Sequence, residues 1–153
     1  MSELMALKRQ LHDACREHLF KREQAIRGAL QEAQAAANEE TKSSAGDKHE
    51  TGRAMMQLET EKLGAQLQEV LREQEKLQRI RPDKHCQSVE PGALVMTDKL
   101  QLYFAISAGK IVVGGQTYYA LSLQTPLGKA ALGRQEDESF AQLEQVYRIK
   151  KIV

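Results

Sequence analysis

Apolar residues recur at seven-residue intervals in the first part of the chain. The positions are Leu4 and Leu11, followed by Leu19, Ile26 and Ala33. Lys, Arg, Glu and Gln fill most positions between them, and no proline interrupts the run. A single apolar stripe of this period is typical of a helix that packs along one seam. The pattern predicts a helix from about Glu3 to Thr41.

A second run of the same kind follows. Met56, Leu63, Val70 and Leu77 are each seven residues apart, again without a proline. Pro82 ends this run, because proline cannot donate to the helix ladder and restricts the residue before it. The pattern predicts a second helix from about Asp47 to Ile80.

The segment between the two helices predicts a turn. Residues 42–47 are small or polar and include Gly46. A short connection makes two helices antiparallel neighbours, and about 35 residues at a rise of about 1.5 Å each form an arm roughly 50 Å long. Because heptads usually mean a helical partner, a hairpin that serves only dimerisation is an open alternative.

The last third of the chain changes to strand periodicity. Leu100, Leu102, Phe104 and Ile106 alternate with more polar residues, a short apolar run spans 93–96, and further strands are predicted at 111–113, 118–123 and 145–153. Gly114 and Gly115, directly after 111–113, predict a tight turn. A helix interrupts them: Thr125 suits an N-cap, Pro126 the first helical position and Gly133 a left-handed stop. We therefore expect an α+β chain in which a helical hairpin precedes a small antiparallel sheet with one helix.

Length and composition agree with a compact domain plus an appendage. The predicted parts are a coiled-coil hairpin over residues 1–80, a linker over 81–91 and a sheet domain over 92–153. Charged residues form 28% of the 153 residues, aromatic residues 5%, and the net charge is +1. Since neither half carries a basic excess of note, the sequence argues against free nucleic-acid wrapping or membrane adhesion.

The two cysteines, Cys15 and Cys86, support neither a zinc site nor a disulfide framework. They are far apart in sequence and form no CxxC motif. Together with the absence of a signal-peptide pattern and of a long apolar run, they fit a cytoplasmic protein.

Two acids, Asp47 and Glu50, lie at the predicted bend of the hairpin. A carboxylate pair is the kind of oxygen ligand that Mg²⁺ takes, but it fills only part of an octahedral site. The same residues also read as a helix start, because Asp is a favoured N-cap and Glu three residues later completes a capping-box pattern. Ser44 and Asp47 repeat that pattern one turn earlier. Both interpretations are open, and they are compatible.

The order of these parts and two motifs resemble the bacterial Gre transcript cleavage factors. The segment Gly46–Glu50 looks like the tip signature of that family, which reads Gly-Asp, two residues, then Glu. The segment Thr125–Gly133 is similar to its Ser-Pro-Leu-x-x-Ala-Leu-x-Gly motif. The acidic stretch Glu136–Glu138 stands where the family has a Gly-Asp-rich turn, and Tyr147–Ile152 resembles its last strand.

The resemblance implies an FKBP-like sheet domain that docks on RNA polymerase and a hairpin that enters the secondary channel. The acids Asp47 and Glu50 are then expected to help hold a Mg²⁺ ion shared with the polymerase, so that the polymerase cleaves backtracked RNA. Lys42, Lys48 and Arg53 are the expected contacts to the nascent RNA. The resemblance implies no enzyme activity of the chain alone, no tightly bound cofactor, no membrane and no free small-molecule substrate.

This sequence departs from the family after Glu50. The family continues with Asn-Ala-Glu-Tyr, whereas Thr51, Gly52, Arg53 and Ala54 follow here. A regulator or inhibitor that occupies the same channel without stimulating cleavage is therefore an alternative.

Two further alternatives concern single features. His49 between the acids could take part in proton transfer, or it could be incidental. The FKBP-like resemblance also raises a peptidyl-prolyl isomerase, whose pocket would have to come from the few aromatic residues: Tyr103, Phe104, Tyr118, Tyr119, Phe140 and Tyr147.

Overall fold

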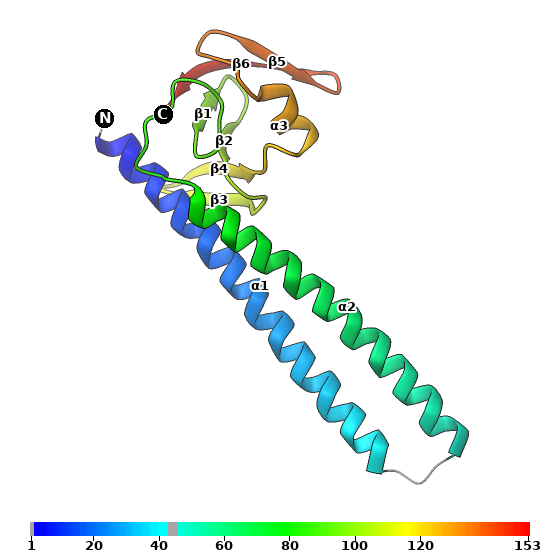
Figure 1. Cartoon of the computed structure of the whole chain (residues 1–153). Coiled ribbons are helices and arrows are strands. Elements are labelled where there is room, and N and C mark those ends of the chain that lie inside the picture. Colours follow the sequence, from blue (N-terminus) through cyan, green and yellow to red (C-terminus); the bar gives the residue numbers. More distant parts are fainter. Residues whose placement is uncertain (1, 43–45) are drawn as a thin grey trace. The chain divides into compact units, whose positions relative to one another are not determined.

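Two long helices form the first half of the chain. The computed structural model describes the backbone of residues 2–42 and 46–153 and the side chains of residues 3–39 and 51–153. Helices α1 (Ser2–Lys42) and α2 (Gly46–Arg79) lie side by side (Figure 1). Six strands and one short helix follow: β1 (Leu94–Thr97), β2 (Gln101–Phe104), β3 (Gly109–Val113), β4 (Gln116–Leu121), α3 (Pro126–Ala131), β5 (Ser139–Gln142) and β6 (Gln145–Ile152). The predicted α+β class is confirmed.

The chain packs as two compact units. Unit 1 combines Met1–His18 with Glu75–Val153, and unit 2 is the segment Leu19–Gln74. Each long helix therefore contributes residues to both units. Unit 2 contains only helical residues and their connection, whereas unit 1 contains the whole sheet.

Unit 2 is held together by the predicted heptad positions. Leu19, Ile26 and Ala33 of α1 are buried, as are Leu63 and Val70 of α2. Each lies seven residues from the next on its own helix, so one face of each helix is apolar and packs against the other. The heptad prediction is confirmed for these five positions.

The sheet of unit 1 is mixed rather than wholly antiparallel. Its strand order is β3-β4-β2-β1-β6-β5, and every neighbouring pair is antiparallel except β2 and β4, which run parallel. The expectation of an antiparallel sheet is wrong at this pair. After β2 the chain crosses to the sheet edge, forms β3, and returns as β4 between β3 and β2. Alternation of apolar residues gives strand positions but not strand direction, so the sequence could not show this crossover.

A two-residue turn joins β3 to β4. Gly114 and Gly115 have φ angles of 58° and 78°. Positive φ at both central residues is what a tight hairpin turn of the favoured type requires, and glycine adopts it without steric cost. The tight turn predicted at this pair of glycines is confirmed.

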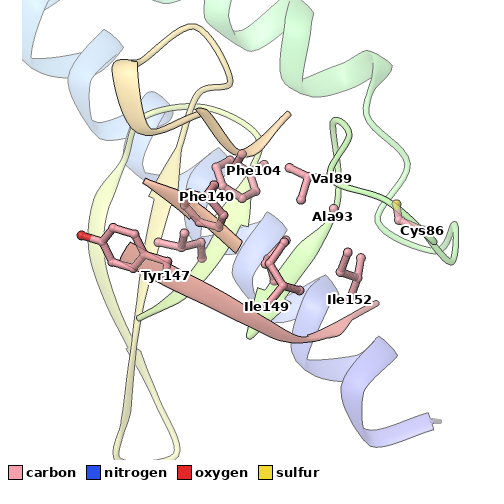
Figure 2. Close-up of a cluster of buried hydrophobic side chains, with 11 residues drawn as sticks. Cys86, Val89, Ala93, Phe104, Phe140, Tyr147, Ile149 and Ile152 are labelled. Carbon is pink, nitrogen blue, oxygen red and sulfur yellow. The ribbon is translucent and has the colours of Figure 1, made fainter. Parts of the chain in front are cut away.

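One face of the sheet carries a buried apolar cluster. It includes Val95, Leu102, Phe104, Ile149 and Ala131, the last contributed by α3. Figure 2 shows Phe140 and Tyr147 beside Ile149 in this cluster, and their rings stack with centroids 5.3 Å apart. Such aromatic pairs bury a large apolar area, so they are a main source of stability for a small domain.

The sequence patterns missed one strand. β5 (Ser139–Gln142) has polar residues at both ends, and only Phe140 is buried. Four residues with one inward apolar side chain carry too little alternation to be recognised. The observed β4 (Gln116–Leu121) also begins and ends two residues earlier than the predicted strand.

Candidate functional site

The predicted tip acids follow the connection between the two long helices. α1 ends at Lys42 and α2 begins at Gly46, so Asp47 and Glu50 fall in the first turns of α2. The side chains of these two acids, and those of Lys42, Lys48 and His49, lie outside the described residues. Their roles in metal binding, RNA contact and proton transfer therefore stay predictions.

The start of α2 bears on the competing helix-cap interpretation. An N-cap residue precedes the first helical residue, whereas Asp47 lies inside the helix that begins at Gly46. Asp47 is the second residue of α2 as the structure bounds this helix. An acid in the first turn is still favoured by the helix dipole, by about 0.3–1 kcal/mol. Ser44, the alternative cap, lies outside the described residues.

Arg53 is the one predicted RNA contact whose side chain is described. It lies in α2 and is exposed. Gly52 lies beside it within the same helix, where glycine costs up to about 1 kcal/mol relative to alanine.

Polar contacts reinforce the body of the hairpin. Within unit 2, Glu23 of α1 accepts hydrogen bonds from Gln74 Nε2 at 3.0 Å and from Arg27 Nε at 2.7 Å. Gln74 lies on α2, so this carboxylate joins the two helices. The side-chain hydrogen bond from Gln74 is the main reason that the pKa of Glu23 lies below its usual value. Arg22 and Glu73 add an interhelical ion pair at 3.7 Å.

The described side chains contain no ready-made metal site. Among them, no group of three or more His, Cys, Asp and Glu residues is placed to hold an ion. Asp47 and Glu50 are outside that set. At the tip the sequence offers two carboxylates three residues apart, Asp47 and Glu50, a hard oxygen set that suits Mg²⁺ and fills two of about six positions.

The α3 segment has the cap that the sequence predicts. Thr125 has an extended backbone, and its hydroxyl Oγ1 accepts a hydrogen bond from the backbone N–H of Gly128 at 3.1 Å. Pro126 is the first helical residue, where its missing N–H costs nothing. Gly133 has a φ of +81° two residues after the helix, as the predicted left-handed stop requires.

Gly128 is required inside α3 for a different reason. A Cβ at this position would lie 2.5 Å from the carbonyl oxygen of Ser122 and 2.6 Å from Cα of Leu123. Both are backbone atoms that cannot move aside as a flexible side chain could. The close approach explains why a glycine stands in the middle of a helix, where alanine is otherwise preferred.

A buried lysine joins the start of α1 to the sheet domain within unit 1. Lys8 is fully buried, and its Nζ donates to the backbone oxygens of Lys84 at 2.5 Å and Val153 at 2.9 Å. It also donates to Sγ of Cys86 at 3.8 Å. Burial lowers the pKa of Lys8, because an ammonium group loses solvation there.

A buried histidine lies one helical turn further along. His12 is 3% exposed, and its Nδ1 lies within hydrogen-bonding distance, 2.8 Å, of the hydroxyl of Tyr103 on β2. Burial, assisted by the charge of Arg16, lowers the pKa of His12. Burial likewise raises the pKa of Tyr103. The pair is therefore neutral in the folded protein near neutral pH.

The burial of Lys8 and His12 was not predicted from the sequence. Lys8 and His12 are four residues apart, and Leu11 and Cys15 on the same side of α1 are also buried. The signal available was the position of two polar residues within an apolar stripe. Since polar residues in a stripe are more often at its edge than within it, that signal is weak.

The aromatic residues considered for a proline-binding pocket belong to the core. Of the six, Tyr103, Phe104, Tyr118, Phe140 and Tyr147 are buried. The remaining one, Tyr119, is half-buried on β4. Side chains committed to packing are not available to bind a peptide.

Comparisons with known proteins include a remote structural likeness. The chain matches no protein-family model and no curated protein. Among solved structures it is similar to one described as the structure of the transcription factor Gfh1, with 22% identity, 89% of this chain and 91% of that chain covered, and a TM-score of 0.36. A TM-score of this size does not assign a function. In the described part of the chain, no helix is long and apolar enough to cross a bilayer.

Proposed function

We propose that the chain is an accessory factor of bacterial RNA polymerase that acts in the cytoplasm and stimulates cleavage of backtracked RNA. In this proposal the hairpin enters the secondary channel, and Asp47 and Glu50 at its tip complete a metal site in the polymerase. The supporting observation is the position of the two acids directly after the connection between two long helices. Positions three apart on a helix are surface neighbours, which suits two ligands of one ion.

The dimensions of unit 2 agree with insertion into a channel. The part of α1 in this unit, from Leu19 to Lys42, is about 36 Å long at a rise of about 1.5 Å per residue. Leu19, Ile26 and Ala33 of α1 are buried, and a short connection joins the end of α1 to the start of α2. A helical pair that buries its main apolar stripe between its two helices is a suitable carrier for a polar tip.

The chemistry of the tip requires a second protein. Two carboxylates leave about four positions of a Mg²⁺ ion to water, to substrate and to ligands from the polymerase. When bound, such an ion supplies Lewis-acid activation at a phosphodiester. Lys42, Lys48 and Arg53 would contact phosphates of the RNA and hold its 3′ end. The isolated chain is therefore expected to have negligible nuclease activity.

The test uses a stalled elongation complex with end-labelled RNA and Mg²⁺. Wild-type protein is expected to shorten the RNA from its 3′ end. Asp47→Asn and Glu50→Gln each remove one ligand charge and are expected to abolish shortening while polymerase affinity is nearly unchanged. Glu59→Gln is the matched control, because Glu59 is an exposed acid of α2 away from the tip, and it should cleave like wild type. Equal shortening by wild type, Asp47→Asn and Glu50→Gln would refute the metal role.

One observation favours a second candidate, a channel-binding regulator that does not stimulate cleavage. Gly52 lies inside α2 two residues after Glu50, and glycine weakens a helix there by up to about 1 kcal/mol. A less rigid start of α2 would hold Asp47 and Glu50 less firmly as metal ligands. In the same assay this function gives slower RNA synthesis without shortening, and Asp47→Asn leaves that slowing unchanged.

A further inference from the structure

An amine and a thiol from distant parts of the chain meet inside unit 1. Lys8 Nζ and Cys86 Sγ are 3.8 Å apart, although the residues are 78 positions apart in sequence. Both side chains are almost fully buried. The backbone oxygen of Lys84 contacts both, since it lies 2.5 Å from Nζ and 3.9 Å from Sγ. The amine and the thiol therefore contact each other and the same carbonyl oxygen.

Cys86 is one of the residues that line a pocket of unit 1. The pocket has a volume of ≈ 360 Å³ and is lined by His85, Cys86, Gln87, Gln135, Glu136 and Ile152. Figure 2 shows Cys86 on the segment after α2, apart from the aromatic side chains of the core cluster. Hydrogen peroxide is close to water in size, so it fits such a space.

We propose that Lys8 and Cys86 form an oxidative modification site, in which peroxide converts the pair to a covalent sulfenamide between Nζ and Sγ. In the first step Cys86 loses its proton, the thiolate attacks one oxygen of H₂O₂ as the O–O bond breaks, and the leaving hydroxide takes up the proton, which gives sulfenic acid and water. In the second step the neutral Lys8 amine attacks the sulfur, the S–O bond breaks, and hydroxide leaves with a proton from nitrogen as water. The net change is R–SH + R′–NH₂ + H₂O₂ → R–S–NH–R′ + 2 H₂O.

The surroundings of the pair favour the second step. Burial lowers the pKa of Lys8, so more of the amine is in the neutral, nucleophilic form than at the protein surface. Burial raises the pKa of the Cys86 thiol, and the Lys8 charge acts in the opposite direction. The first step is therefore slow, because little of Cys86 is in the thiolate form. Once the sulfenic acid forms, the Lys8 amine is already in contact with the sulfur.

The rest of the chain offers an internal control. Cys15 is the other buried free thiol, but its hydrogen bond is with the backbone of Ile106. Burial raises the pKa of Cys15 to about 12. Peroxide is therefore expected to give no cross-link at this residue.

The experiment treats the full-length protein with hydrogen peroxide and measures its mass without reduction. The cross-link removes two hydrogens, so the intact mass is expected to fall by about 2 Da and to return after a small thiol is added. Trypsin should no longer cleave after Lys8, and the peptide that contains Lys8 should be joined to the peptide that begins at His85. Cys15→Ser should behave like wild type.

Two variants keep the test independent of folding defects. Lys8→Arg retains a positive charge and donors but cannot form the bond, and Cys86→Ser removes the sulfur with little change in size. Neither should give the joined peptide. Recovery of wild-type Cys86 as the free thiol or only as sulfinic and sulfonic acids, with Lys8 still cleaved by trypsin, would overturn the proposal. Because the site does not involve the hairpin tip, this outcome is independent of the cleavage assay.

Discussion

Gly128→Ala is expected to destabilise the sheet domain, although it replaces glycine by alanine inside a helix. The added Cβ would approach Ser122 O to 2.5 Å and two backbone atoms of Leu123 to 2.6 and 2.8 Å. Distances under 3.0 Å are essentially never observed for a real Cβ, so the segment before α3 must shift. Overpacking of this kind costs about 1–3 kcal/mol. The gain in helix propensity, up to about 1 kcal/mol, offsets only part of that cost.

The assay is urea unfolding followed by tyrosine fluorescence. The chain has no tryptophan, and its four tyrosines all belong to unit 1: Tyr103, Tyr118, Tyr119 and Tyr147. Fluorescence therefore reports on the part of the molecule that contains α3. The free energy of unfolding typically falls by about 1–3 kcal/mol per molar urea, so a net loss of about 1–2 kcal/mol in that free energy lowers the urea midpoint by roughly 1 M.

Gly64→Ala is the matched control, because it makes the same chemical change in a helix with open space around it. A Cβ at Gly64 of α2 would have no atom within 4 Å apart from its chain neighbours and the nearby backbone of its own helix. Far-UV circular dichroism, to which the long helices contribute most, should show a stabilisation of up to about 1 kcal/mol. An unfolding midpoint of Gly128→Ala at or above that of wild type would refute the reasoning from the backbone contact.

Three further predictions concern unit 1. Thr125→Ala removes the hydroxyl that caps α3 and should cost about 1 kcal/mol in urea unfolding, whereas Thr125→Ser should retain most of it. The pKa of His12 in the folded protein lies below its ordinary 6.5, so the stability that this residue contributes is fully present above pH 6.5 and is lost as the pH falls from 6.5 through the folded pKa. His12→Gln should flatten this pH dependence, and an unchanged slope between pH 5 and 7 would contradict the prediction. Leu143 is 89% exposed and has a φ of 59°. Leu143→Gly should therefore raise the urea midpoint of unfolding, because it relieves about 1 kcal/mol of backbone strain. A lower midpoint would contradict this and would show that the leucine side chain has a structural role.

Local patterns predicted the helices and their ends well. The seven-residue spacing placed the buried seam of α1 and α2, and Thr125, Pro126 and Gly133 marked the limits of α3. These features depend on neighbouring residues, because helix periodicity, caps and positive φ are local properties. The glycine pair between β3 and β4 was predictable for the same reason.

Long-range features were not predictable from the same patterns. The parallel pairing of β2 with β4 depends on a crossover, which no spacing within either strand encodes. Gly128 looks like an ordinary helix residue until the backbone of Ser122 is placed beside it. The burial of Lys8 and His12 depends on hydrogen-bond partners that lie more than 70 residues away in sequence. For the tip acids, the sequence motif and the start of α2 at Gly46 are the available support.

The two buried polar side chains of α1 define its register on the sheet domain. Lys8 and His12 are one helical turn apart, and each has its own acceptor or partner. A slip of α1 by one turn, about 5.4 Å, would bring an imidazole to the carbonyls that now accept hydrogen bonds from Lys8 Nζ. Leucine at both positions would tolerate such a slip, because apolar contacts are not directional. We therefore expect Lys8 and His12 to exclude misaligned assemblies at some cost in stability, as polar groups do at apolar helix interfaces.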